Sequence, residues 1–215
     1  MFYNARMKTL IWDFNGTILD DVDIDIEIES ILLDRRGMPR IPSKDWYLEH
    51  FRFPVKDYYY DLGYTFDDET YEDISVQYQE LYRERIFRIP LNPGVEDKLQ
   101  QAHEQGYRNV IISASEQNLL ELQLKELGIR DMFDAVIGIP DMLAVSKVEQ
   151  AKKWMKADGV DPDECIYIGD TDHDVETAHA LGIERIYLVS FGHQAAHLLQ
   201  RACSRVVDSF DEVVL

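Results

Sequence analysis

The sequence predicts an α/β protein: a doubly wound parallel sheet with helices on both faces and a smaller helical segment inserted after the first strand. Two patterns lead to this prediction. After Pro90, short buried strands alternate with amphipathic helices, which is typical of parallel sheets. Before it, most apolar residues of the stretch 19–90 recur at helical spacing. Because crossovers between parallel strands are right-handed, the polar strand ends are expected along one edge of the sheet.

Composition is that of a globular protein rich in acidic groups. The 215 residues are 46% hydrophobic. Lysines and arginines number 22 and acidic residues 41, which gives a net charge of −19. Such a surface repels phosphate backbones, so no nucleic-acid partner is expected, and no apolar run is long enough to predict a membrane span. Two cysteines, Cys165 and Cys203, supply no disulfide framework and favour a reducing, cytoplasmic location. Monomer and dimer are both compatible with the sequence.

The first strand is expected at Thr9–Trp12, an apolar, β-prone run that Gly16 interrupts. Asp13 therefore lies at the carboxyl end of a strand, where open α/β sheets place their ligands. A helix is expected over 21–36, because acidic residues crowd its start and arginines its end, and Gly37 stops it.

Residues 41–90 are expected to be helical rather than additional sheet. Ser43 predicts the N-cap of a helix over 44–51. A short aromatic helix is expected over 57–62, and a long one from Asp67 or Asp68 to about Arg88. The tyrosines of this segment are expected to pack in a core with their hydroxyls at its rim.

After Pro90 the chain alternates between the two kinds of element. Helices are predicted over 95–105, 119–127, 148–156 and 175–181, and strands over 109–115, 133–139, 165–170, 185–189 and, as a short edge strand, 206–207.

Four polar clusters follow predicted strands or lie between them: Asp13-Phe-Asn-Gly-Thr17, Ser113, Lys147 and Gly169-Asp-Thr-Asp-His-Asp174. This set, in this order, resembles the haloacid dehalogenase-like (HAD) superfamily, whose motifs are Asp-x-Asp-x-Thr, a Ser or Thr, a Lys and an acidic pair. The run Leu91-Asn-Pro-Gly-Val95 is similar to the phosphoglycolate phosphatase-like subgroup. The resemblance implies a Rossmann-like core of residues 1–18 and 91–215 and a helical cap domain of residues 19–90.

The resemblance also implies an activity, a Mg²⁺-dependent phosphatase of small phosphorylated metabolites. Asp13 would attack phosphorus and form an aspartyl-phosphate that water later hydrolyses. Asp13, the backbone carbonyl of Asn15, Asp170 and Asp174 would hold Mg²⁺, which prefers hard oxygen ligands. For the last two aspartates, capping of a helix N-terminus is the alternative. Asp172 is expected near the metal or in solvent, and His173 is not expected as a ligand.

Further residues are expected to bind the phosphoryl group. Lys147 would place a positive charge on it and orient Asp13, unless it is an ordinary solvated lysine. The Ser113 hydroxyl and the backbone N–H groups of Ala114, Phe14 and Asn15 would donate to its oxygens. Thr17 is expected to support the loop rather than touch substrate.

The stretch 50–56 lies where similar proteins carry a loop that sets substrate specificity. Arg52 is the first candidate to contact an anionic leaving group and Lys56 the second, and both are alternatively plain surface charges. Residues 21–40 contain no lysine, so the Schiff-base chemistry of a phosphonatase is not expected.

Asn15 departs from the pattern of the family, which has an aspartate there that protonates the leaving group and then activates water. An amide does not exchange protons in this way. Two alternatives follow: a slow phosphatase, or a catalytically impaired HAD-fold pseudoenzyme that binds phosphate and metal as a regulatory protein. A receiver-type signalling domain phosphorylated on aspartate is disfavoured, because it would lack the insertion at 19–90.

Overall fold

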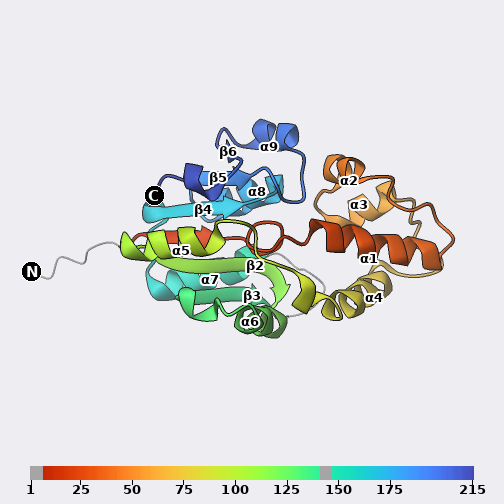
Figure 1. The fold of residues 1–215 in the computed structure, drawn as a ribbon, viewed down its shortest axis with the longest axis horizontal. Coiled ribbons are helices and arrows are strands. Elements are labelled where there is room, and N and C mark those ends of the chain that lie inside the picture. The colour runs from red at the N-terminus through yellow and green to blue at the C-terminus, as the bar shows by residue number, and fades with distance from the viewer. Residues whose placement is uncertain (1–6, 141–146) are drawn as a thin grey trace, which may run out of the picture.

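One parallel sheet of six strands organises the molecule (Figure 1). The computed structural model describes residues 7–140 and 147–215. The strands are β1 (Thr9–Trp12), β2 (Arg108–Glu116), β3 (Ala135–Ile139), β4 (Cys165–Gly169), β5 (Ile186–Val189) and β6 (Val206–Val207). Their order is β3-β2-β1-β4-β5-β6, so the direction of winding reverses between β1 and β4. Ligands of such sheets bind outside the carboxyl ends of the strands at this reversal.

Helices cover both faces of the sheet, which confirms the predicted doubly wound fold. The alternation of side chains along β1 sends Leu10 and Trp12 to one face and Ile11 to the other. On the first face the strands pack against α5 (Val95–Glu104) and α6 (Gln117–Glu126). The other face carries α7 (Lys147–Asp158), α8 (Asp172–Ala180) and α9 (Ala196–Ala202).

Four helices lie beyond the carboxyl edge of the sheet (Figure 1). They are α1 (Val22–Arg35), α2 (Lys44–His50), α3 (Val55–Asp61) and α4 (Tyr71–Arg83), and we call residues 19–90 the helical insertion. The chain enters and leaves it side by side, because the Asp20 N–H donates to the Pro90 carbonyl at 3.0 Å and the Asn92 N–H to the Ile18 carbonyl at 2.8 Å. In the described part of the chain, no helix has the length and apolar character needed to cross a membrane.

Most predicted elements are present, and the exceptions have local causes. The long helix expected from Asp67 or Asp68 begins only at Tyr71, because Thr70 and Asp73 form a capping box, and it gives way after Arg83 to a 3₁₀ turn. Helix α9 was not predicted, since it has seven residues and no side-chain cap at Ala195. Short 3₁₀ turns lie at Ile86–Arg88, Arg130–Met132, Pro162–Glu164 and Phe210–Glu212.

Candidate active site

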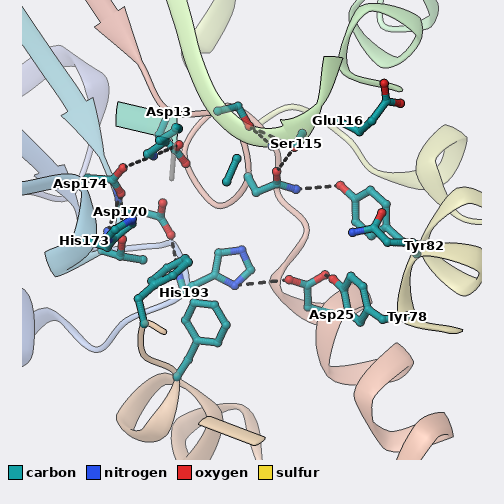
Figure 2. A pocket seen from close by; sticks show the side chains of 18 of the residues that line it. Asp13, Asp25, Tyr78, Tyr82, Ser115, Glu116, Asp170, His173, Asp174 and His193 are labelled. Carbon is teal, nitrogen blue, oxygen red and sulfur yellow. Dashed lines mark hydrogen bonds and ion pairs between the residues drawn. The ribbon is translucent and has the colours of Figure 1, made fainter. Parts of the chain in front are cut away.

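A cavity of about 160 Å³ lies between the carboxyl ends of β1, β2 and β4 and the helical insertion (Figure 2). Three of the predicted polar clusters contribute to it through Asp13, Ser113 and Asp170, and the fourth through Lys147 at the start of α7. The volume is well below the roughly 300–1,000 Å³ of sites for drug-sized ligands. The cavity therefore suits a small ligand.

Three buried carboxylates meet at the base of the cavity. One oxygen from each of Asp13, Asp170 and Asp174 lies within 4.8 Å of the others. The Lys147 Nζ is 2.5 Å from the Asp13 Oδ1 and 2.6 Å from the Asp174 Oδ1. Burial raises the pKa of Asp13 well above its ordinary value, the charge of Asp174 raises it further, and Lys147 opposes both. Three carboxyl groups share one ammonium, and a divalent cation would supply the positive charge that keeps them ionised, so this donor set fits Mg²⁺.

The two aspartates after β4 are held differently. Asp174 Oδ2 accepts from the backbone N–H groups of Asp170 and Thr171 and from the Thr171 hydroxyl, which caps α8. Helix capping, the expected alternative for Asp174, is thus present in the structure, and Oδ1 is the oxygen that remains for a cation. Asp170 accepts from the Thr17 hydroxyl at 3.1 Å and from the His193 N–H at 2.8 Å, and burial raises its pKa to about 7.

Asn15 is bonded through both ends of its amide. Its Nδ2 donates to the Asp21 Oδ2 at 2.5 Å and to the Tyr82 hydroxyl at 2.8 Å, while its Oδ1 accepts from the Ser115 hydroxyl at 2.9 Å. Asp21 is fully buried, and its Oδ1 accepts from the Gly16 N–H at 2.7 Å. An amide at position 15 therefore provides the donor that the buried carboxylate of Asp21 needs.

The loop after Asp13 is fixed by a residue whose role sequence reasoning missed. The buried amide of Asn92 donates to the carbonyls of Gly16, Thr17 and Leu19 over 2.9–3.2 Å. Gly16 has a φ of +68°, and a Cβ there would lie 2.2 Å from the Asp170 Oδ2. The signal for Asn92 was its place in the run 91–95, which pointed to a family but not to this contact.

His193, in the loop after β5, was also missed. Its Nε2 lies 3.2 Å from the Asp21 Oδ1, and its Nδ1 lies 2.8 Å from the Tyr47 hydroxyl and 3.7 Å from the Asp25 Oδ2. Burial disfavours the charged ring, but the hydrogen bond and charge of Asp21 and the charges of Asp25 and Asp170 outweigh it and raise the pKa of His193 to about 10. The one available signal was its position after a strand that ends at the same edge of the sheet.

The core loop 193–195 also binds the helical insertion directly. The Ala195 N–H donates to the Leu48 carbonyl at 3.0 Å, and the Gln194 Nε2 donates to the Phe51 carbonyl at 3.1 Å. Together with the contact between Tyr47 and His193, these bonds hold the insertion over the cavity.

Arg52 and Lys56, expected to contact a leaving group, are not among the residues that line the cavity. Arg52 is half-exposed, and its Nη2 lies 2.9 Å from the Asp61 Oδ2. The Lys56 Nζ lies 5.3 Å from the centre of the Phe66 ring. Their positive charges are directed to partners within the insertion.

The other expected residues lie as follows. Ser113 and Ala114 line the cavity, and the Ser113 hydroxyl donates to the Ser115 hydroxyl at 3.0 Å. The Phe14 side chain is fully buried in the core. Asp172 accepts from the Gln194 side chain at 2.9 Å, and the His173 ring stacks on Phe53 with centroids 4.5 Å apart. Neither belongs to the carboxylate group at the base of the cavity.

Comparisons with known proteins show what the chain is similar to. The profile of the haloacid dehalogenase-like hydrolase family matches residues 10–188. The chain is 26% identical to a phosphoglycolate phosphatase of Nitrosococcus oceani, over 96% of this chain and 94% of that protein. It is 23% identical to one of Pseudomonas fluorescens, over 100% and 81%. A haloacid dehalogenase-like family hydrolase of Streptococcus pneumoniae superposes with a TM-score of 0.74 at 20% identity, covering 95% of both chains, which shows the shared fold.

Proposed function

The chain belongs to the haloacid dehalogenase-like hydrolase family, and on that premise we propose that it is a Mg²⁺-dependent phosphatase of small phosphorylated metabolites that acts through an aspartyl-phosphate. One observation carries the proposal. Asp13, at the end of β1, has the Lys147 Nζ at 2.5 Å, and Ser113 lines the same small cavity. Phosphoryl transfer to a protein side chain uses these groups: a carboxylate nucleophile, a fixed cation and a hydroxyl donor.

The roles of the individual residues follow from their chemistry. The Asp13 carboxylate attacks phosphorus as the bond to the leaving oxygen breaks, and the alkoxide released takes a proton from water. A water molecule then hydrolyses the aspartyl-phosphate, which releases phosphate and the free carboxylate. Lys147 neutralises charge on the transferring group, and Ser113 and the N–H groups of Ala114, Phe14 and Asn15 donate to its oxygens. Asp13, Asp170, Asp174 and the Asn15 carbonyl would hold Mg²⁺, which supplies charge neutralisation during transfer.

The helical insertion, residues 19–90, would act as a cap domain on a core of residues 1–18 and 91–215. Its bonds to the loop 193–195 hold it over the cavity, and closure of such a domain on a substrate would exclude bulk water and strengthen the electrostatic interactions inside. The substrate would be a small phosphoester, because the cavity is about 160 Å³. A cytoplasmic location, which the cysteine content favours, is also proposed.

One observation favours a second candidate, an impaired enzyme that binds phosphate and metal as a regulatory protein. The Asn15 amide is bonded to Asp21, Tyr82 and Ser115, and it has no proton to exchange with a leaving group. This arrangement supports slow or arrested turnover, especially of phosphoesters whose alcohol is a poor leaving group.

Phosphoenzyme trapping tests the proposal and separates the two candidates. Protein incubated with Mg²⁺ and acetyl phosphate, then acid-quenched, is expected to carry one phosphoryl group on Asp13 by peptide mapping. Asp13→Asn should abolish it, and chelation of Mg²⁺ should suppress it, while the exposed-site variant Asp23→Asn serves as the control. A phosphoenzyme that forms but does not turn over supports the regulatory protein. Full turnover in chelator, or in the Asp13 variant, refutes the phosphatase.

A further inference from the structure

The wall of the cavity opposite Asp13 comes from the helical insertion. Its lining residues, which we call the far wall, are Asp25, Phe51, Phe53, Tyr78, Gln79 and Tyr82. Figure 2 shows Asp25 and Tyr78 across the cavity from Asp13 and Asp174. A leaving group that extends from a phosphoryl group on Asp13 therefore meets aromatic rings and a carboxylate.

Within the described parts of the chain, no arginine lines this cavity. The lining groups that can carry a positive charge are Lys147, held by Asp13 and Asp174, and two histidines. His193 is paired with Asp21 and Asp25, and His173 contacts the Glu176 carboxylate at 3.0 Å. The segment 141–146 reads Asp-Met-Leu-Ala-Val-Ser and contains no basic residue.

An anionic leaving group is poorly matched to these surroundings. Its carboxylate would be buried beside Asp25 without a cation of its own, and burying an unpaired charge is strongly unfavourable. Glu116 adds a further acidic group to the lining, where it caps α6 and lies 4.0 Å from the Arg83 Nη2. Electrostatics at this end of the cavity thus disfavour a phosphorylated hydroxy acid.

The same surroundings are matched to a cation. Asp25 is buried, its Oδ1 accepts from the Tyr78 hydroxyl, and its Oδ2 lies 3.7 Å from the His193 Nδ1. Since Asp21 also binds His193, two carboxylates share one imidazolium and negative charge remains. Aromatic rings such as Phe51 and Phe53 attract a nearby cation through their π faces. The far wall therefore offers an ion-pair partner and aromatic surface together.

We propose that the far wall selects short phosphomonoesters whose alcohol carries a protonated amine, with Asp25 as the ion-pair partner of the ammonium group. The inference rests on the phosphatase function proposed above and names its substrate class. The small cavity fits a phosphoryl group with a short aminoalkyl chain.

Binding of inert analogues tests this choice independently of turnover. Three phosphonates of similar length are titrated calorimetrically into the Mg²⁺-loaded protein: 3-aminopropylphosphonate, butylphosphonate and 3-phosphonopropionate. Measurements at pH 8 keep Asp25 ionised, because its pKa is raised to about 7 by burial and by Asp21. We expect the amine to bind at least about tenfold more tightly than the neutral analogue, as a hydrogen bond to a charged group allows, and the acid most weakly. Equal or tighter binding of the neutral or acidic analogue overturns the proposal.

Two variants of helix α1 locate the effect. Asp25→Asn is expected to bring the amine-to-neutral affinity ratio close to one. Asp23→Asn removes the same charge from a side chain that is 76% exposed, and it should keep the ratio, which controls for general attraction to the acidic surface. A ratio that survives Asp25→Asn refutes the role of Asp25, and if that variant does not fold, the wild-type series still decides the substrate class. Acetyl phosphate turnover, measured in parallel, reports whether the proposed phosphatase function itself fails.

Discussion

Replacing Asn15 by aspartate introduces a carboxyl group where the resemblance implies an acid–base residue, and the structure predicts both a gain and a cost. The Asn15 Nδ2 lies 2.5 Å from the Asp21 Oδ2. In Asn15→Asp, an oxygen would take the place of this donor and face a second, fully buried carboxylate. The two carboxyl groups are therefore expected to share one proton.

The size of the effect follows from Coulomb's law. Two unit charges about 4 Å apart interact by about 4 kcal/mol at an effective dielectric constant of about 20. That energy corresponds to about three pKa units, which moves a carboxyl of ordinary pKa about 4 towards 7. A proton held near neutral pH is available to an alkoxide leaving group, and such acid–base help is worth roughly 10²–10⁴-fold.

Two assays check this expectation. Turnover of an alkyl phosphate should rise by that factor in Asn15→Asp, whereas turnover of acetyl phosphate, whose leaving group needs no proton, should change much less. In urea unfolding, the variant should lose stability relative to wild type as pH rises from about 4 to 7. The sign follows because the folded state retains a proton that the unfolded state has released.

The reasoning fails if fresh wild-type protein hydrolyses alkyl phosphates as fast as the variant. Asn15-Gly16 is a dipeptide prone to deamidation, which would place some aspartate at position 15 in aged samples. Intact mass and peptide mapping should therefore accompany every assay. A variant as stable at pH 8 as at pH 5, relative to wild type, would show that the Asp21 carboxylate does not feel the new charge.

Three further outcomes are expected. Burial raises the pKa of Glu29 to about 8, so Glu29→Gln should stabilise the protein increasingly between about pH 4.5 and 8, and an unfolding free-energy difference that is flat over this range contradicts it. Arg52→Ala should leave the relative kcat/KM values of acidic and neutral substrates unchanged, because Arg52 pairs with Asp61 outside the cavity; a selective loss on acidic substrates would return it to the site. Asn92→Ala should lower the free energy of unfolding by roughly 2–3 kcal/mol in urea titrations, since buried carbonyls lose their donor, whereas the exposed-site control Asn118→Ala should have little effect.

The parts of the molecule that sequence reasoning predicted well are those determined by nearby residues. The strand Thr9–Trp12 and the cap at Ser43 depend on local patterns, and both are as expected. Asp13 and Asp170 follow buried strands, so parallel pairing alone brings them to one edge.

The remaining parts depend on which distant residues meet. Asp25 and His193 are 168 positions apart in the sequence, and only the docking of the helical insertion makes them neighbours. The direction of the Arg52 side chain is similarly set by Asp61, nine residues away, rather than by the loop that carries it. Residue type and position could nominate Arg52, but they contained no information about which carboxylate would bind it.

The side-by-side passage of the chain into and out of the helical insertion has a consequence for how this protein diversifies. Leu19 and Leu91 pair in an isolated bridge. The chain therefore leaves and rejoins the sheet domain at one place, as it does at the two ends of a surface loop. Doubling the length of such a loop costs only about 0.6 kcal/mol of closure entropy. Apart from Tyr82, which is bonded to Asn15, mutation and recombination can therefore rebuild or exchange the far wall while Asn92 holds the loop after Asp13. The residues that carry out the reaction and most of those that select the substrate can thereby change separately within one gene.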